Sequence, residues 1–391
     1  MGAVDRTYAG PGGGRHGVGG TVAGGVNLLG LRSHNAALVL DLLRTAGEAG
    51  ISRLELAERT GLTPQAVSKI TARLRADGLA VEAGRRASTG GKPRTVLRLV
   101  PDAGHAVGLH LDRDELRAVL CDLTGAVIAE RRSPLDLGAG REAVVEGAAR
   151  EVEALLTGAV RVPDTVPLPV LGVGVALPGP LDHRHGVLHR VTGFPEWDGF
   201  PLRDALVRRL GMPVVVDKDT NAAALGLALG GAAEAASASF AYLHLGTGLG
   251  AGLVIGGVVH RGARTGAGEF GHQVVQLDGP PCPCGDRGCI EALCLAAAAR
   301  GDMAEAARVL GAGAANLAGL LDIDLVLLGG RTVAAHPEPF VDGVGAVLDA
   351  RARREGSTRG VPVRVAPGGA RGVAEGAAQL LLAPLFGRAE D

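Results

Sequence analysis

The sequence has very few aromatic residues: six Phe, two Tyr and one Trp among 391 residues. A core built mainly from large rings is therefore excluded, and the 63 glycines indicate that tight turns and close packing of small residues matter more. The sequence also lacks any run of about 18 uncharged apolar residues, and no basic start is followed by an apolar segment. These absences predict a cytoplasmic protein with no membrane partner.

A large excess of charge of either sign is also lacking, because the formal net charge is −1. The first 100 residues nevertheless hold 14 Lys and Arg against 7 Asp and Glu, whereas the remainder holds 26 against 34. A basic module on an acidic body suits attraction to a phosphate backbone at one end of the chain. A solvated basic face without a partner would give the same counts.

The chain divides into four segments by composition and periodicity. Residues 1–30 contain 11 glycines without hydrophobic periodicity, which predicts a disordered leader rather than a nucleotide loop. Further on, the order strand, strand, strand, helix occurs twice, which predicts two related α/β lobes that share a cleft. The expected boundaries are a leader at 1–30, a winged helix-turn-helix at 31–100, a first lobe at 105–232, and a second lobe at 237–391 whose last helix packs back on the first lobe.

Residues 31–100 have the order of a winged helix-turn-helix. Ser52 and Thr63 are suitable N-caps for two short helices, and Pro64 occupies the first helical position of the second one. Two strand-like runs then flank a basic hairpin. The residues expected to meet DNA lie on this second helix and in the wing: Gln65, Ser68, Lys69, Arg73, Arg85, Arg86, Lys92 and Arg94. Three short helices could equally form a protein-docking element, although the basic outward-facing side chains favour DNA.

The sharpest local signal is a short cluster of cysteines. Cys282, Cys284 and Cys289 lie within eight residues, and His272 precedes the first of them by ten. Thiolates and an imidazole in so short a segment match the tetrahedral preference of zinc, so the sequence predicts one structural zinc ion per chain. The spacing alone leaves a redox cluster or plain buried cysteines open, and a disulfide is the weaker alternative in the cytosol.

Three motifs carry a family resemblance: Gly268-Glu269-Phe270-Gly271-His272, the cysteine run that continues to Glu291, and the glycine loop Leu245–Gly252. In this order and spacing they resemble the ROK family of repressors and sugar kinases, over most of residues 105–386. The resemblance implies an α/β body with a two-lobed actin-like fold of the hexokinase and ribonuclease H type. It also implies that a sugar binds between the lobes and that zinc shapes its pocket. The helical segment 292–316 is shorter than is usual in the family, which implies an altered lobe or altered subunit contacts.

The resemblance also implies roles for single residues. The implied zinc ligands are His272, Cys282, Cys284 and Cys289. Glu269, His272 and Glu291 would face sugar hydroxyls. Asp219 stands where the family's kinases have the Asp that accepts the proton of the attacking sugar hydroxyl. Lys218 replaces an Asn that touches sugar, which implies a changed ligand such as an acidic or phosphorylated sugar, unless this lysine simply lies at the surface.

The decisive departure from the family lies in the first strand pair, where its kinases carry Asp-x-Gly-Gly-Thr near the phosphates of ATP. This chain reads His110-Leu111-Asp112-Arg113-Asp114 instead. Side chains in place of glycines keep the backbone away from phosphate, and two carboxylates repel it unless a metal intervenes. Kinase activity is therefore expected to be lost. The second glycine loop would then be vestigial or purely architectural at Gly246, Thr247, Gly248 and Gly250.

Taken together, these features predict a sugar-responsive transcriptional regulator, in the simplest case a repressor of carbohydrate metabolism genes. Its expected partners are a palindromic double-stranded DNA operator, a sugar or sugar phosphate effector, and further copies of the chain in a homodimer or homotetramer. One alternative is an active ATP-dependent sugar kinase with a DNA-binding appendage, which Asp219 and the glycine loop favour. Another is a protein-interaction adaptor, which would show no DNA affinity at low salt.

Overall fold

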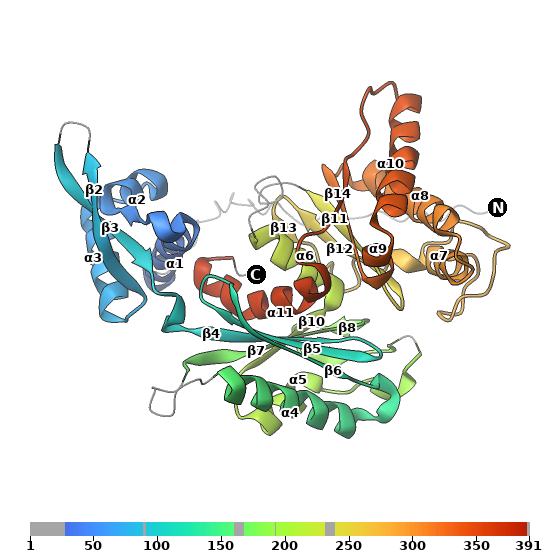
Figure 1. The fold of residues 1–391 in the computed structure, drawn as a ribbon, viewed down its shortest axis with the longest axis horizontal. Coiled ribbons are helices and arrows are strands. Elements are labelled where there is room, and N and C mark those ends of the chain that lie inside the picture. Colours follow the sequence, from blue (N-terminus) through green and yellow to red (C-terminus); the bar gives the residue numbers. More distant parts are fainter. Residues whose placement is uncertain (1–27, 89–90, 160–167, 192, 231–238, 389–391) are drawn as a thin grey trace, which may run out of the picture.

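The computed structural model of the chain describes residues 28–88, 91–159, 168–191, 193–230 and 239–388. The predicted leader at 1–30 lies outside these residues except for its last three, which already belong to the first helix. Within the described ranges, no helix is long and apolar enough to cross a membrane. Figure 1 shows a small winged module at one end of the molecule, next to a larger body of two lobes.

The winged module forms because its two short helices are capped as the sequence predicts. The Ser52 hydroxyl accepts a hydrogen bond from the Glu55 N–H while the Glu55 carboxylate accepts one from the Ser52 N–H, and the Thr63 hydroxyl accepts one from the Ala66 N–H. The three strands form a sheet of order β1-β3-β2. The elements of the module are α1 (Leu28–Ala46), β1 (Ile51–Ser52), α2 (Arg53–Thr60), α3 (Pro64–Ala76), β2 (Ala80–Ser88) and β3 (Gly91–Leu99).

The first lobe is built on a five-stranded sheet of order β10-β7-β4-β5-β6. Strands β4, β5 and β6 are antiparallel neighbours, and β7 and then β10 add in parallel on the other side of β4. Helices α4 and α5 bury their apolar residues against this sheet. Its elements are β4 (His105–Leu111), β5 (Glu115–Asp122), β6 (Val127–Pro134), α4 (Arg141–Ala159), β7 (Val170–Leu177), β8 (Leu181–Asp182), β9 (Val187–Leu188), α5 (Leu202–Leu210), β10 (Val214–Lys218) and α6 (Asp219–Leu229).

The second lobe repeats this topology, as the recurring order of strands predicts. Its sheet has the order β13-β12-β11-β14-β15, with antiparallel pairs before β11 and parallel pairs after it. Residues 292–316 fold as parts of α7 and α8, which only a three-residue turn separates. The elements are β11 (Phe240–Leu245), β12 (Leu249–Ile255), β13 (Val258–Val259), α7 (Ile290–Ala299), α8 (Met303–Leu321), β14 (Leu325–Gly329), α9 (Arg331–Ala335), α10 (Pro337–Arg354) and β15 (Val363–Val365).

Helix α11 (Gly372–Leu382) joins all three parts of the molecule. It packs against α6 and against β4 and β7 of the first sheet (Figure 1). Glycines allow this approach, because a Cβ at Gly108 would overlap the Ala374 carbonyl oxygen and a Cβ at Gly376 would overlap that of Ala222. The 3₁₀ turn Ala383–Phe386 then continues onto α1, and residues of the winged module share one buried core with α11.

We expect Gly376→Ala to lower the free energy of unfolding by about 2–3 kcal/mol, because the added methyl group must push the backbones of α11 and α6 apart. The matched control is Gly345→Ala in α10, where an added Cβ meets nothing within 4 Å. This control should be neutral or stabilising by about 0.5–1 kcal/mol. Urea denaturation followed by circular dichroism measures both. Equal stability of the two variants would contradict the contact between α11 and α6.

Candidate ligand site and metal centre

One cavity brings together all five residues predicted to contact sugar. It has a volume of about 80 Å³ and lies between residues of the two lobes. The five predicted residues that line it are Lys218, Asp219, Glu269, His272 and Glu291. We call it the inner cavity. His244 and Arg113 also line it, and the sequence analysis did not single out either of them as a ligand contact.

The position of Asp219 follows from the junction between β10 and α6. β10 ends at Lys218 and Asp219 is the first residue of α6, so its half-buried carboxylate lies at the helix N-terminus and accepts a hydrogen bond from the Thr220 N–H at 2.6 Å. Asp217, two residues earlier in β10, is buried and forms an ion pair with Arg261 at 2.7 Å. This neighbouring pair fixes the end of β10, so that Asp219 is presented to the cavity.

Lys218 is buried, so the interpretation that placed this lysine at the surface is wrong. Its side chain is 3% exposed, and its ammonium group donates hydrogen bonds to the Ala267 carbonyl oxygen and to Glu269, the latter at 3.1 Å. Burial of a lysine without such partners would be costly. Lys218 therefore connects the end of β10 to the loop that carries Glu269, and it occupies one oxygen of Glu269.

Glu291 is also buried, unlike an ordinary surface glutamate. It lies in the first turn of α7 and accepts a hydrogen bond from the Leu249 N–H at 2.8 Å. This bond connects α7 to the glycine turn between β11 and β12. Thr247, Gly248 and Gly250 of that turn line the inner cavity, and Gly246 does not.

The predicted metal ligands come together as a set of four. The ligand atoms of His272, Cys282, Cys284 and Cys289 all lie within 4.8 Å of one another. Cys282 Sγ is 3.7 Å from His272 Nδ1, and Cys284 Sγ is 3.7 Å from Cys289 Sγ. Four ligands on a tetrahedral zinc ion with bonds of about 2.3 Å would be about 3.8 Å apart, so the cluster has the right size for a metal ion. Because Nδ1 faces the thiols, Nε2 is the His272 nitrogen left for a ligand.

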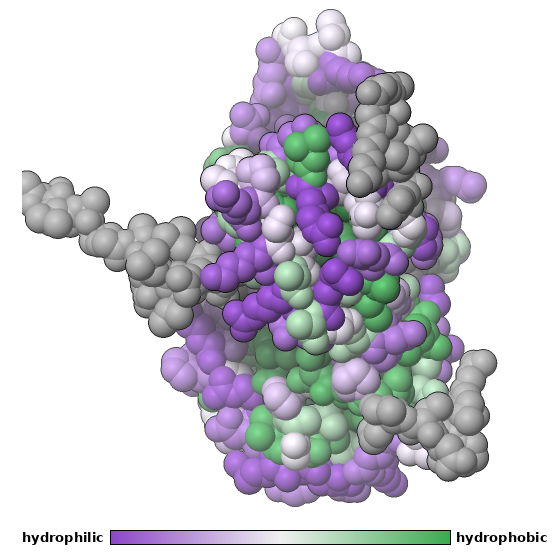
Figure 2. Space-filling view, turned by 90° about the vertical axis from the view of Figure 1, so that its left-hand side faces the viewer, coloured by the Kyte–Doolittle hydropathy of each residue, from purple (hydrophilic) through white to green (hydrophobic). Residues whose placement is uncertain are grey.

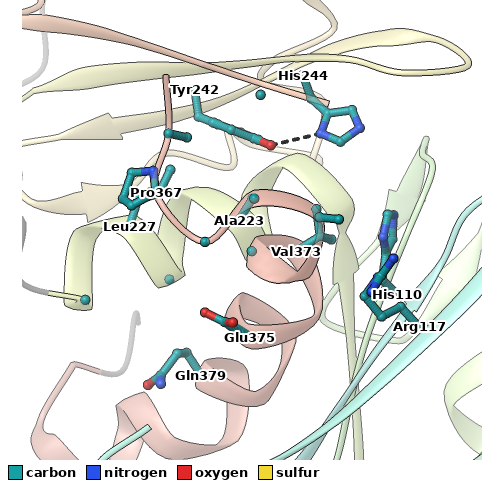
Figure 3. A pocket seen from close by; sticks show the side chains of 18 of the residues that line it. His110, Arg117, Ala223, Leu227, Tyr242, His244, Pro367, Val373, Glu375 and Gln379 are labelled. Atoms are coloured by element: carbon teal, nitrogen blue, oxygen red, sulfur yellow. Dashed lines mark hydrogen bonds between the residues drawn. The ribbon is translucent and has the colours of Figure 1, made fainter. Parts of the chain in front are cut away.

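A much larger cavity, of about 920 Å³, lies beyond the inner one between the lobes. Figure 3 shows Tyr242 and His244 bonded to each other on one wall, at 2.9 Å, and Glu375 and Gln379 projecting from α11. Burial lowers the pKa of His110, so its imidazole is neutral at neutral pH. Asp112 and His244 line both cavities, which places the two cavities end to end.

The turn between β4 and β5, where this chain departs from the family's kinases, forms hydrogen bonds with an arginine of the other lobe. Arg331, the first residue of α9, donates two hydrogen bonds to Asp114, at 2.6 and 2.9 Å, and one to Asp112 at 2.7 Å. The hydrogen bond from Arg331 lowers the pKa of Asp114. Burial acts to raise the pKa of Asp112, but the neighbouring His110 and the bond from Arg331 outweigh it, so this pKa is also lowered. Both carboxylates therefore stay ionised, and Arg331 offsets one of their two negative charges.

The four predicted DNA contacts on α3 are all exposed: Gln65, Ser68, Lys69 and Arg73. Arg94 of the wing is exposed as well. Arg85, Arg86 and Lys92 belong to strands β2 and β3, but their side chains lie outside the described part of the structure. Viewed from the end of the molecule that carries the winged module, hydrophilic residues cover much of the upper part of the surface (Figure 2).

Comparison with known proteins agrees with both parts of this architecture. The sequence model of the ROK family matches residues 106–303, and a model described as winged helix-turn-helix DNA-binding matches residues 39–80. The chain is 28% identical to the xylose repressor of Caldicellulosiruptor bescii over 241 residues, which make up 62% of this chain and 59% of that protein. It is 31% identical to the DNA-binding transcriptional dual regulator NagC of Escherichia coli K12 over 270 residues, which cover 68% and 63% of the two chains.

The fold of the whole described chain also has a known counterpart. A ROK family transcriptional regulator, described as a homolog of the E. coli MLC protein, superposes with a TM-score of 0.73 at 22% identity and covers 92% of this chain and 97% of its own. At this identity the likeness concerns the fold alone. Because the family model spans half of the sequence and the fold agrees, the chain belongs to the ROK family.

Proposed function

We propose that the protein is a sugar-responsive transcriptional repressor of carbohydrate metabolism genes, which binds DNA in the cytoplasm and holds a sugar or sugar derivative in its inner cavity. The observation that carries this proposal is the ion pair of Arg331 with Asp112 and Asp114, beside a complete set of predicted sugar contacts. The residues predicted to contact sugar are all present, whereas the turn that would approach the phosphates of ATP carries two carboxylates bonded to Arg331. Such a protein is suited to binding a sugar without phosphoryl transfer. The relatives, one named as a xylose repressor and one as a DNA-binding transcriptional dual regulator, support the same function.

The inner cavity offers a sugar both acceptors and donors. The carboxylates of Asp219, Glu269 and Glu291 accept hydrogen bonds from hydroxyl groups, and Lys218 has one N–H left to donate after its two protein partners. His272 presents its second ring nitrogen. When bound by His272, Cys282, Cys284 and Cys289, a zinc ion would fix the orientation of this imidazole and of the loop next to it.

A sugar kinase remains the second candidate function, because Asp219 occupies the position of the catalytic base and the large cavity adjoins the inner one. Phosphoryl transfer depends on groups that hold the transferred phosphate in place. Here the turn that would do so carries Asp112 and Asp114, already bonded to Arg331. We therefore place the kinase second.

DNA binding would depend on the coupling of two winged modules. We propose that the body forms a homodimer or homotetramer, so that two copies of α3 bind a palindromic operator. The two half-sites of this operator would lie about one helical turn of DNA apart. Sugar binding between the lobes would then alter the distance or angle between the two copies of α3.

Metal analysis tests the zinc site. We expect about one zinc ion per chain in the purified protein, because four thiolate and imidazole ligands form a closed tetrahedral site. Cys289→Ser should lose the ion, whereas Cys121→Ala, at a buried cysteine of β5, should keep it. Inductively coupled plasma mass spectrometry measures both. Metal-free wild-type protein with freely titratable thiols would refute the site.

A coupled assay of ADP release tests the second candidate function. Over a panel of hexoses, pentoses and N-acetylated amino sugars, we expect the rate with Mg-ATP to be no higher than that of the Asp219→Asn variant, because the phosphate turn is occupied. That variant serves as the matched control, since it lacks the carboxylate at the position of the family's catalytic base. Turnover of about 1 per second or faster, lost in Asp219→Asn, would instead establish the kinase.

Substitutions on α3 test DNA binding. For a duplex selected in vitro with the wild-type protein, Lys69→Ala and Arg73→Ala should each weaken binding by about 1–3 kcal/mol, because each removes a charged contact to bases or phosphates. Arg354→Ala, at an exposed arginine of α10, is the matched control and should bind normally. Fluorescence anisotropy measures all three. Absence of any wild-type affinity at low salt would favour the adaptor.

A further inference from the structure

A third cavity adjoins the inner one, on the side away from Asp112 and Asp114. Its volume is about 430 Å³, and we call it the outer cavity. It shares two residues with the inner cavity, Glu269 and His272. Its other lining residues come from the loop before β8, from the loop after β9, and from residues 282–289, which we call the metal loop: Pro180, Arg190, Val191, Gly193, Pro195, Asp198, Pro283 and Cys284.

The three cavities therefore lie in a fixed order. Asp112 and His244 separate the large cavity from the inner one, and Glu269 and His272 separate the inner cavity from the outer one. A ligand ring in the inner cavity would place one hydroxyl group at Asp219, close to the phosphate turn. The opposite end of the ring would then lie between Glu269 and His272 and point into the outer cavity.

The sizes of the two cavities are unequal. A buried water molecule needs on the order of 10–15 Å³ of such space, so the inner cavity, at about 80 Å³, has room for about one sugar ring. At about 430 Å³ the outer cavity has room for at least one more. A group attached to the ring end at Glu269 and His272 would extend into the outer cavity, which adjoins the inner one at these two residues.

The walls of the outer cavity suit a neutral polyhydroxyl group. The side chains of Arg190 and Asp198 are 90% and 52% exposed, and they form one loose ion pair with each other at 4.0 Å. A guanidinium donates to hydroxyl oxygens, and a carboxylate accepts from hydroxyl groups, so the two together can hold a hydroxyl pair. The charges of Arg190 and Asp198 cancel, and Lys218 offsets the charge of Glu269. The outer cavity therefore has no excess positive charge to hold a phosphate or a carboxylate. Pro195 and Pro283 add apolar surface for the C–H face of a ring.

We infer that the effector is a neutral glycoside of at least two sugar units, with its first ring in the inner cavity and its second ring between Arg190, Asp198 and the metal loop. This inference rests on the proposed sugar-binding function and specifies its ligand class. Lys218 and Asp219 would recognise the first ring, and Arg190 and Asp198 the second.

Titration calorimetry with matched pairs of sugars tests the inference: xylose with xylobiose, glucose with cellobiose, and N-acetylglucosamine with its β-1,4-linked dimer. In at least one pair we expect the disaccharide to bind ten times more tightly than the monosaccharide, or more. Monosaccharide binding that is equal or tighter in every pair would overturn the inference and leave the proposed function standing. No binding by any of the six sugars would overturn both.

Two variants distinguish binding of the second ring in the outer cavity from binding of the first ring in the inner cavity. Arg190→Ala and Asp198→Ala change exposed side chains, so the fold should be kept. Each should reduce the affinity for the disaccharide about tenfold and leave that for the monosaccharide within about twofold. Asp219→Asn should weaken both ligands, and Arg354→Ala should weaken neither. A disaccharide affinity unchanged in Arg190→Ala and Asp198→Ala would overturn the placement of the second ring.

Discussion

The structure depends on the close contact between α11 and α6, in which no side-chain carbon separates the two backbones. Gly226 and Gly376 lie against each other there, and a Cβ at Gly376 would overlap a backbone oxygen of α6. Close-packed interfaces of this kind shift between discrete arrangements and do not deform gradually. Because α6 begins with Asp219, a displacement of this residue and a displacement of α11 are mechanically linked.

The bond of Arg331 to Asp112 and Asp114 is a second connection between the lobes, at the opposite end of the inner cavity from Glu269 and His272. Exposed ion pairs are individually weak, but the two hydrogen bonds to Asp114 fix the orientation of the guanidinium as well as its distance. In the family's kinases the phosphates of ATP would lie at this turn. In this chain the connection needs no nucleotide, so under the proposed function the sugar would be the ligand that changes the relation between the lobes.

The sequence allows prediction of the parts whose residues are neighbours along the chain. The caps at Ser52 and Thr63 and the cluster from His272 to Cys289 depend on local spacing, and the structure contains both. The burial of Lys218 could not be predicted, because its partners at Ala267 and Glu269 are some fifty residues away and are brought to it by the fold. The ion pair of Arg331 could not be predicted for the same reason, since Arg331 lies more than two hundred residues from Asp112 and Asp114. The outer cavity is formed by loops that lie far apart in the sequence and share no motif.

The route from the cavities to the DNA-binding surface passes through the end of the chain. After α11 the 3₁₀ turn Ala383–Phe386 packs on α1, with Phe386 under the guanidinium of Arg44 at 5.1 Å and Arg388 paired with Asp41 at 3.0 Å. Phe386 belongs to the same buried core as Val39 and Leu43 of the winged module. A core shared in this way resists rotation of the module about a loose linker, so a shift of α11 would carry the winged module with it. Under the proposed function, a ligand that displaces α6 by even a small amount would therefore reach α3 through packed helices, without any contact between sugar and DNA.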